Sequence, residues 1–255
     1  MTTQSFKKLV GHVVPDFALA LRRRVKRYAR ALRDRNLSPA HVFSDIYENN
    51  LWGGKKGEFC SGEGSSLSAN IVYCDYVKSF IADHHIKSVL DIGCGDFQVS
   101  RNIVASHFDY IGVDVVAPLI ERNQRKFAND HISFRSLDVI KDELPRVDLV
   151  LIREVLQHLS NQQISAILAK VETAPYVIIT EYQPASEHLG RANIDKPHGM
   201  DTRIWNHSGV YIDQPPFARE KVEVVLEIPV ENYLVKPGER LVSYLLAKNN
   251  SSDIQ

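Results

Sequence analysis

The residues best suited to chemistry gather where short apolar runs of the chain end. Asp91 lies in the run 88–92, which leads directly into the turn Gly93-Cys94-Gly95. Glycine adopts backbone angles closed to other residues and lets a ligand approach the N–H groups of such a turn. A carboxylate at this point would repel a pyrophosphate, whereas it suits a positive amino group. The turn therefore predicts a binding site for a ligand with a cationic end.

Two further carboxylates follow the next apolar runs. Asp114 comes about twenty residues after the glycine turn, and an acid at this spacing can accept two hydrogen bonds from a ribose diol. Asp138 could accept a hydrogen bond from an adenine amino group, with Leu137 or Val139 packed on the ring. Helix capping by Asp114 and turn formation by Asp138 are the structural alternatives. Together with Asp91, these carboxylates outline a site for adenosine with a charged tail.

A nicotinamide dinucleotide would place an acid at the same point after the second strand. Its phosphate-binding fingerprint, however, requires a third glycine three residues after the second. This chain has Gln98 there, so the fingerprint is incomplete. An adenosyl ligand with an amino-acid tail and a sulfonium centre satisfies both the adenosine site and the carboxylate at its tail.

Helices and strands that alternate from residue 67 onward must position these residues. Apolar runs predict strands at 88–92, 110–115, 132–136, 147–152 and 176–181, and helical periodicity predicts helices at 67–83, 97–107, 117–128 and 161–171. This alternation is typical of a doubly wound, mostly parallel α/β sheet, whose ligands lie beyond the carboxyl ends of the strands. The strands predicted at 222–228 and 240–248 have no helix between them and should pair antiparallel.

We expect residues 1–66 to form a basic helix and a cap, and residues 67–255 to form the main domain. Residues 17–35 combine an apolar stripe with many Lys and Arg side chains; the stripe consists of Phe17, Leu21, Val25, Tyr28 and Leu32. Such a helix could dock on the body, or it could contact an anionic membrane or another polyanion. Residues 1–40 carry a net charge of +8 and residues 41–255 a net charge of −8. The acidic body argues against a stable nucleic-acid partner.

A cap segment is predicted between this helix and the main domain. A helix at 38–49, N-capped by Ser38, leads into a loop rich in glycine and serine. Trp52 and other aromatic residues in this loop favour a lid over a site, with a flexible linker as the alternative. Ser61 and Gly62 could present hydrogen-bond donors to a ligand carboxylate.

Four segments resemble the motifs of the class I S-adenosylmethionine-dependent methyltransferases. They are Val89-Leu90-Asp91-Ile92-Gly93-Cys94-Gly95-Asp96 for motif I, Tyr110-Ile111-Gly112-Val113-Asp114 for the second motif, Ser136-Leu137-Asp138 for the adenine side, and Val155-Leu156-Gln157-His158-Leu159 after the fourth strand. The resemblance covers residues 87–248 and implies S-adenosylmethionine as cofactor. It also implies a seven-stranded sheet of order 3-2-1-4-5-7-6 with the last strand antiparallel. Phe97 departs from the family, which often has a third glycine there; this aromatic could narrow the site or pack on the lid.

The candidate site residues lie at the ends of the predicted strands, in the predicted cap and the irregular segment near residue 200, or within the motifs that resemble the family. Those assigned to the cofactor are Ser61, Gly62, Asp91, Gly93, Cys94, Gly95, Asp114, Val115, Asp138, Val139 and Arg153. Methyl transfer from a sulfonium is a direct displacement, for which the protein aligns the reacting atoms and excludes water. An alcohol acceptor also needs a base; His158 is the first candidate, and Glu181 and Tyr182 come next. A structural histidine is the alternative for His158. Residues expected to contact the acceptor are Trp52, His198, Asp201, Arg203 and His207.

We therefore expect O-methylation of a hydroxyl on a sugar, glycan or other small metabolite, lipid-linked if the basic helix meets a membrane. RNA methylation and a non-catalytic subunit that binds S-adenosylmethionine are the alternatives. Cys60, Cys74 and Cys94 lack the spacing of a metal site, and no metal is expected. No apolar run approaches the ~20 residues of a membrane span. This pattern predicts a cytoplasmic protein, with a peripheral position at the inner membrane face as a further possibility.

Overall fold

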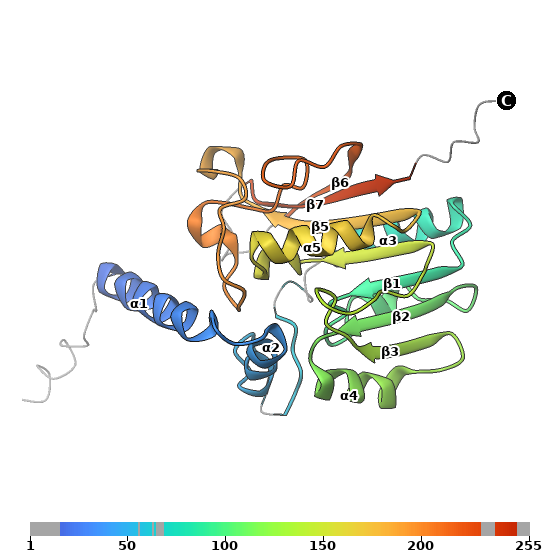
Figure 1. Cartoon of the computed structure of the whole chain (residues 1–255), viewed down its shortest axis with the longest axis horizontal. Helices are drawn as coiled ribbons and strands as arrows, with labels where there is room; N and C mark the ends of the chain where they lie inside the picture. Colours follow the sequence, from blue (N-terminus) through green and yellow to red (C-terminus); the bar gives the residue numbers. More distant parts are fainter. Residues whose placement is uncertain (1–15, 56, 63, 65–68, 231–237, 249–255) are drawn as a thin grey trace, which may run out of the picture.

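The computed structural model describes residues 16–55, 57–62, 64, 69–230 and 238–248, which include a seven-stranded sheet with helices on both sides (Figure 1). The strands are β1 (Ser88–Ile92), β2 (Asp109–Asp114), β3 (Ile132–Ser136), β4 (Leu149–Arg153), β5 (Tyr176–Gln183), β6 (Val222–Pro229) and β7 (Arg240–Ala247). Their order is β3-β2-β1-β4-β5-β7-β6; β1 to β5 pair in parallel, and β7 is antiparallel to β5 and β6. The predicted order and the antiparallel last strand are confirmed, with strand ends shifted by one or two residues.

Helices cover both faces of this sheet. Successive side chains of a strand point to opposite faces, so neighbouring residues of β1 pack against different helices. Val89 packs on one side with α3 (Ala69–Asp83). Leu90 packs on the other side with α5 (Asn161–Val171). Strands buried on both faces have nearly continuous apolar sequences, and for this reason the strands could be located from the sequence.

The helices of the cap and of the sheet edge begin at signals that the sequence carries. α2 (Pro39–Glu48) follows Ser38, whose hydroxyl accepts the N–H of His41 at 3.3 Å, as the predicted N-cap requires. α4 (Ala117–Phe127) has Pro118 in its first turn, where the missing N–H of proline costs no hydrogen bond.

The helix predicted at 97–107 is wrong. The structure forms a short 3₁₀ helix, Ser100–Asn102, between turns in this segment. Phe97 adopts a φ of 67°, which a helix cannot accommodate, and its ring packs in the core against Tyr110 and Phe134. The aromatic side chain therefore stabilises the core instead of narrowing the site or packing on the lid.

α1 (Asp16–Asp34) extends away from the body on the side of α2 (Figure 1). It contacts the body through Arg27, whose guanidinium lies 3.4 Å from the carboxylate of Asp201 and 5.0 Å from the ring centre of Trp205. Arg30 also donates to the sulfur of Met200. None of the helices in the described ranges has both the length and the apolar character needed to cross a bilayer.

Candidate functional site

A cleft of about 800 Å³ lies beyond the carboxyl ends of β1, β2, β4 and β5. The sheet edge, the cap segment 39–62 and the irregular segment 184–207 enclose it. Every residue assigned to the cofactor from the sequence lines this cleft. Trp52, His158, Tyr182 and His207 also line it, whereas Glu181, His198, Asp201 and Arg203 do not.

The glycine turn fits closely between two neighbouring segments. Gly93 and Gly95 have φ angles of 71° and 54°. A Cβ atom at position 93 would lie 2.4 Å from Cγ2 of Val155, and one at position 95 would lie 2.3 Å from Oγ of Ser61. Only glycine combines these backbone angles with neighbours this close. The backbone of the turn therefore reaches the cleft as the sequence predicts.

Asp91 is buried on β1 at the wall of the cleft. Its Oδ2 atom accepts hydrogen bonds from the hydroxyls of Ser100 (2.5 Å) and Tyr110 (2.6 Å). Its Oδ1 atom accepts none from the described residues, so this oxygen can accept one from a ligand. Burial raises the pKa of Asp91, and a cationic amino group beside it would favour the charged form.

Asp114 joins the end of β2 to the glycine turn. Its Oδ1 accepts the N–H of Val116 at 3.1 Å, and its Oδ2 accepts the N–H of Gly95 at 3.3 Å. The N-cap alternative does not apply, because Val116 is the N-cap residue of α4. Burial raises the pKa of Asp114 to about 6.

Two residues of α4 that the sequence analysis missed also hold the glycine turn. Asn123 is fully buried, and its side-chain amide donates to the carbonyl of Gly95 at 2.7 Å. The guanidinium of Arg122 donates to the carbonyl of Asp96 at 3.0 Å. α4 thereby fixes the path of the chain as it leaves the turn. A polar residue on the buried face of a predicted helix is the signal that could have identified Asn123.

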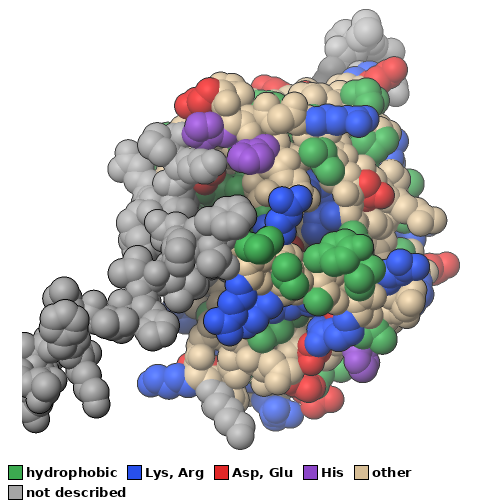
Figure 2. All heavy atoms as spheres, turned by 90° about the vertical axis from the view of Figure 1, so that its left-hand side faces the viewer, with side chains coloured by type: hydrophobic (Ala, Val, Ile, Leu, Met, Phe, Trp, Pro, Cys, Tyr) green, Lys and Arg blue, Asp and Glu red, His purple; other side chains and the backbone are tan. Residues whose placement is uncertain are grey.

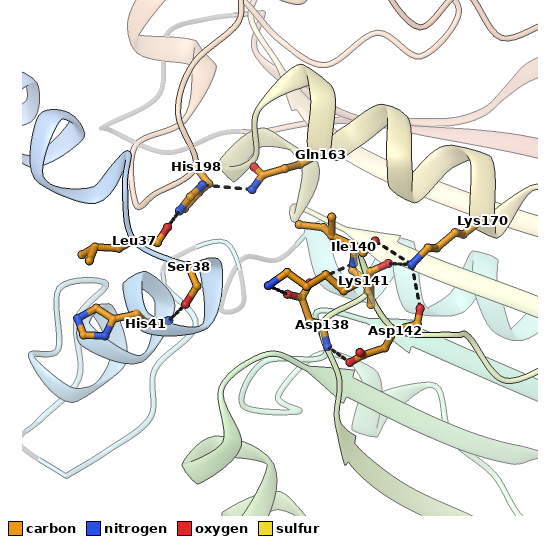
Figure 3. A network of polar contacts seen from close by, with 11 residues as sticks. Leu37, Ser38, His41, Asp138, Ile140, Lys141, Asp142, Gln163, Lys170 and His198 are labelled. Atoms are coloured by element: carbon orange, nitrogen blue, oxygen red, sulfur yellow. Dashed lines mark hydrogen bonds and ion pairs between the residues drawn. The ribbon is translucent and has the colours of Figure 1, made fainter.

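Asp138 makes the contacts of a turn residue (Figure 3). Its Oδ1 accepts the N–H of Ile140 at 3.1 Å, and its Oδ2 lies 3.2 Å from the ammonium of Lys141. Its own N–H donates to the carboxylate of Asp142 at 2.9 Å. The turn alternative is thus realised. Asp138 also lines the cleft, and its contact with adenine stays a prediction.

Reciprocal hydrogen bonds join the cap to the glycine turn. The hydroxyl of Ser61 accepts the N–H of Asp96 at 2.8 Å and lies 3.0 Å from the hydroxyl of Tyr47. The carboxylate of Asp96 accepts the N–H of Ser61 in return, at 3.2 Å. Phe43 and Trp52 line the cleft from the same segment, with ring centres 6.0 Å apart. The cap therefore forms an aromatic wall, while its closure over a ligand stays a prediction.

His158 lies at the cleft wall in the turn that follows β4. Its Nδ1 atom lies 3.2 Å from the carbonyl oxygen of Gly199, so we assign the ring hydrogen to Nδ1 and a lone pair to Nε2. The ring centre lies 5.1 Å from that of Trp52. Burial and the nearby ammonium of Lys196 lower the pKa of His158 to about 3. The imidazole is therefore neutral near pH 7.

Two buried ionisable side chains hold the backbone of this turn from opposite directions. The carboxylate of Glu181 accepts the N–H groups of residues 155–157 at 2.7 to 3.1 Å. Arg203, which is 1% exposed, donates to the three carbonyls of residues 156, 157 and 159 at 2.7 to 3.2 Å. Burial raises the pKa of Glu181 to about 8 and lowers that of Arg203 to about 10. These contacts correct the prediction of Glu181 as a base and Arg203 as an acceptor contact: both residues position the turn that carries His158.

His198 and Asp201 connect the N-terminal segment to the body. The Nε2 atom of His198 lies 2.9 Å from the carbonyl of Leu37, and its Nδ1 lies 3.2 Å from the amide nitrogen of Gln163 (Figure 3). Asp201 pairs with Arg27 of α1. The structure therefore directs the polar groups of both residues to these contacts, and not to the acceptor side of the cleft as predicted.

The cleft wall around Arg153 and Tyr182 contains two further acidic groups, which the sequence did not predict as site residues. The hydroxyl of Tyr182 donates to the carboxylate of Glu239. The Glu154 carboxylate lies 2.9 Å from the guanidinium of Arg153. Glu154 has a φ of 55°, an angle that costs a non-glycine residue free energy. A Cβ atom at Gly64 would lie 2.7 Å from the Glu154 carboxylate, so the cap approaches this group closely.

The wall of the cleft is acidic. Among the wall residues that the structure describes, Arg153 is the only Lys or Arg, and six residues carry carboxylates: Asp91, Asp96, Asp114, Asp138, Glu154 and Glu239. Such an excess of negative charge attracts cations and repels anions, most strongly where water is partly excluded. Within the described ranges, no group of three His, Cys, Asp or Glu side chains is placed to hold a metal ion.

The chain is similar to known methyltransferases in both sequence and fold. A family model described as a methyltransferase domain matches residues 90–174. An uncharacterized methyltransferase of Mycobacterium tuberculosis is 33% identical over 159 residues, which are 58% of this chain and 80% of that protein. The fold is similar to that of the N-methyltransferase NodS of Bradyrhizobium japonicum, with a TM-score of 0.52, 16% identity and coverage of 74% of this chain and 100% of that one. It is also similar to the magnesium protoporphyrin IX methyltransferase of Synechocystis with bound S-adenosylmethionine, with a TM-score of 0.52, 13% identity and coverage of 83% and 98%.

Proposed function

The chain belongs to the class I S-adenosylmethionine-dependent methyltransferases, and we propose that it methylates a hydroxyl of a small polar acceptor, such as a sugar or another hydroxylated metabolite. The observation that carries this proposal is the neutral imidazole of His158 at the wall of the cleft that contains the glycine turn. S-adenosylmethionine supplies a methyl group on a positively charged sulfur, which is already activated for displacement.

The groups at the sheet edge fit this cofactor. The Oδ1 atom of Asp91 is available to accept a hydrogen bond from the amino group. Each oxygen of Asp114 accepts one backbone N–H and retains a lone pair for a ribose hydroxyl. The acidic wall compensates the positive charges of the amino and sulfonium groups. Leu137 and Val139 supply apolar surface for the adenine ring.

His158 would take the proton of the acceptor hydroxyl at Nε2, because Nδ1 is engaged by the carbonyl of Gly199. A pKa of about 3 is low for a base. As the new carbon–oxygen bond forms, however, the hydroxyl becomes a far stronger acid than an imidazolium with this pKa. The proton transfer is therefore favourable once methylation is under way. Trp52 and Phe43 exclude water beside the ring and so support the alignment of the reacting atoms.

The charge of the cleft restricts the acceptor. Glu154 and Glu239 favour an acceptor that is neutral or cationic, and they would repel the phosphates of RNA. The same two carboxylates favour a second candidate function, N-methylation of an amine that the wall holds near the methyl group. Both products gain one methyl group in mass and both resist acid hydrolysis, so NMR of the product, which shows whether the new methyl carbon is bonded to oxygen or to nitrogen, distinguishes an ether from a methylated amine.

Replacement of His158 tests the proposal. With a panel of hydroxylated acceptors and amines, we expect His158→Ala to reduce kcat by about 10²- to 10⁴-fold, the usual contribution of a general base. The affinity for S-adenosylhomocysteine, measured by calorimetric titration, should stay within a few-fold of the wild-type value. His131→Ala, at an exposed histidine remote from the cleft, is the matched control and should leave both quantities unchanged.

Two results would contradict the proposal. Unchanged turnover in His158→Ala would remove the histidine as the base. Binding of the cofactor by the wild-type protein without methylation of any acceptor tested would instead favour the non-catalytic subunit.

A further inference from the structure

α1 presents its apolar side chains to the solvent. Leu21, Val25, Tyr28 and Leu32 are 50%, 59%, 68% and 45% exposed. They recur at intervals of three and four residues, which places them in one stripe along the helix. The sequence predicts this stripe, and the structure adds that the body of the protein does not cover these four members of it.

The face of α1 that contacts the body is polar instead. Arg27 contacts Asp201 and Trp205, and Arg30 contacts Met200. A helix that is stabilised by docking on its own domain normally buries its apolar face. In this chain the apolar stripe lies outside the docking contact, so it is available to a different partner.

Cationic side chains flank the stripe on both sides. At 3.6 residues per turn, Arg22 lies along one edge of it, with Lys26 further round the helix on the same side, and Arg24 lies along the other edge. All three are exposed. Residues 16–35 contain eight Lys and Arg against two Asp. Figure 2 views the molecule from the side on which α1 lies in Figure 1, and hydrophobic and cationic side chains are interspersed on this face.

We propose that α1 binds the surface of a bilayer that contains anionic lipids. The stripe would enter the headgroup region, and the flanking cations would contact lipid phosphates, as in interfacial amphipathic helices. A second copy of the chain is a poorer occupant, because pairing two such stripes would bring cationic edges together. Binding to RNA would use the cations but leave the apolar stripe in water.

α1 lies next to the cleft, so binding of α1 to a bilayer would also place the cleft near the lipids. Met200 and Trp205, which α1 contacts, line the cleft. A protein held at a bilayer through α1 would therefore present this part of the cleft near the lipid surface. Such a position suits an acceptor that is itself attached to lipid. This last step rests on the proposed function, whereas the membrane contact does not.

Vesicle co-sedimentation of the full chain tests the contact. We expect binding to vesicles of phosphatidylcholine mixed with phosphatidylglycerol, weaker binding at high salt, and little binding to phosphatidylcholine alone. The combined variant Leu21→Gln, Val25→Gln and Leu32→Gln should reduce partitioning about tenfold or more, because it removes the inserted apolar surface. The matched control is Ile71→Gln with Val72→Gln, at exposed apolar residues of α3, and should bind like the wild type.

The affinity for S-adenosylhomocysteine, measured on the same preparations, separates this proposal from the proposed function. All variants should retain it, and its absence from the wild type would count against the cofactor site alone. Three outcomes would overturn the membrane contact: no binding of the wild type to anionic vesicles, undiminished binding of the stripe variant, or a wild-type dimer that the stripe variant dissociates without any binding to vesicles.

Discussion

Ionisation of the Asp114 carboxyl should make the affinity for the cofactor depend on pH. Its pKa of about 6 lies above the ordinary value of 3.8, because burial disfavours the charged form. Only the ionised carboxylate can accept hydrogen bonds from both ribose hydroxyls. Protons therefore compete with the cofactor below pH 6, and the complex binds fewer protons at this group than the free protein.

We expect the affinity for S-adenosylhomocysteine to rise by up to about tenfold per pH unit as the pH approaches 6 from below, and then to level off. Calorimetric titration between pH 5 and 8 measures this profile. Asp114→Asn should bind weakly at every pH and show a flat profile in the acidic range, whereas Asp109→Asn, at an exposed residue of the same strand, should behave like the wild type. An affinity of the wild type that is constant from pH 5 to 7 would exclude Asp114 as the titrating group.

The turn after β4 is held by hydrogen bonds from two distant segments, through Glu181 and Arg203. Arg203→Lys would leave carbonyls among residues 156, 157 and 159 without donors, since an ammonium cannot reproduce the planar geometry of a guanidinium. The expected loss of stability in urea unfolding is about 1–3 kcal/mol, the usual cost of unsatisfied buried polar groups.

If Arg203 had a purely structural role, Arg203→Lys would lower the stability and leave kcat unchanged. Because the same turn carries His158, we also expect kcat to fall in Arg203→Lys more than KM for the acceptor rises, with the affinity for S-adenosylhomocysteine within a few-fold of the wild type. Arg191→Lys, at an exposed arginine of the same irregular segment, serves as the control. Wild-type kcat in an Arg203→Lys protein that is folded but destabilised would show that Arg203 does not position the turn for catalysis.

Some parts of the fold and site could be predicted from local sequence patterns, and others depend on contacts between segments that are distant in the chain. The strands and their order were accessible because apolar runs, glycines and acids recur at the spacing that a doubly wound sheet requires. The helix expected at 97–107 failed because the buried ring of Phe97 sets the local backbone, which helical periodicity cannot show. The roles of Glu181 and Arg203 depend on hydrogen bonds to a backbone segment more than twenty positions away in the chain, which no local pattern contains.

The cleft as a whole is assembled from the cap, the sheet edge and the segment 184–207, and the first two meet at the glycine turn, where Ser61 lies beside Gly95 and accepts the N–H of Asp96 at 2.8 Å. Cofactor binding should therefore stabilise the entire protein, provided that this contact is intact. At a hundredfold excess over Kd, a ligand that binds only the folded state adds about 2.7 kcal/mol to the free energy of unfolding. For a chain of this length, such a gain raises Tm by roughly 5–11 °C.

Gly95→Ala should retain the fold and lose most of this ligand-induced rise in Tm, because a Cβ atom would lie 2.3 Å from the hydroxyl oxygen of Ser61 and force the cap away from the turn. Gly57→Ala is a matched control: Gly57 also has a positive φ, 85°, yet a Cβ atom there would meet nothing within 4 Å. Both variants lose some stability without ligand, since alanine is strained at a positive φ. Thermal unfolding with and without S-adenosylhomocysteine separates this shared cost from the loss of the contact. If Gly95→Ala gains as much Tm from the ligand as Gly57→Ala does, the cap does not contribute to cofactor binding, and the sheet edge alone forms the site.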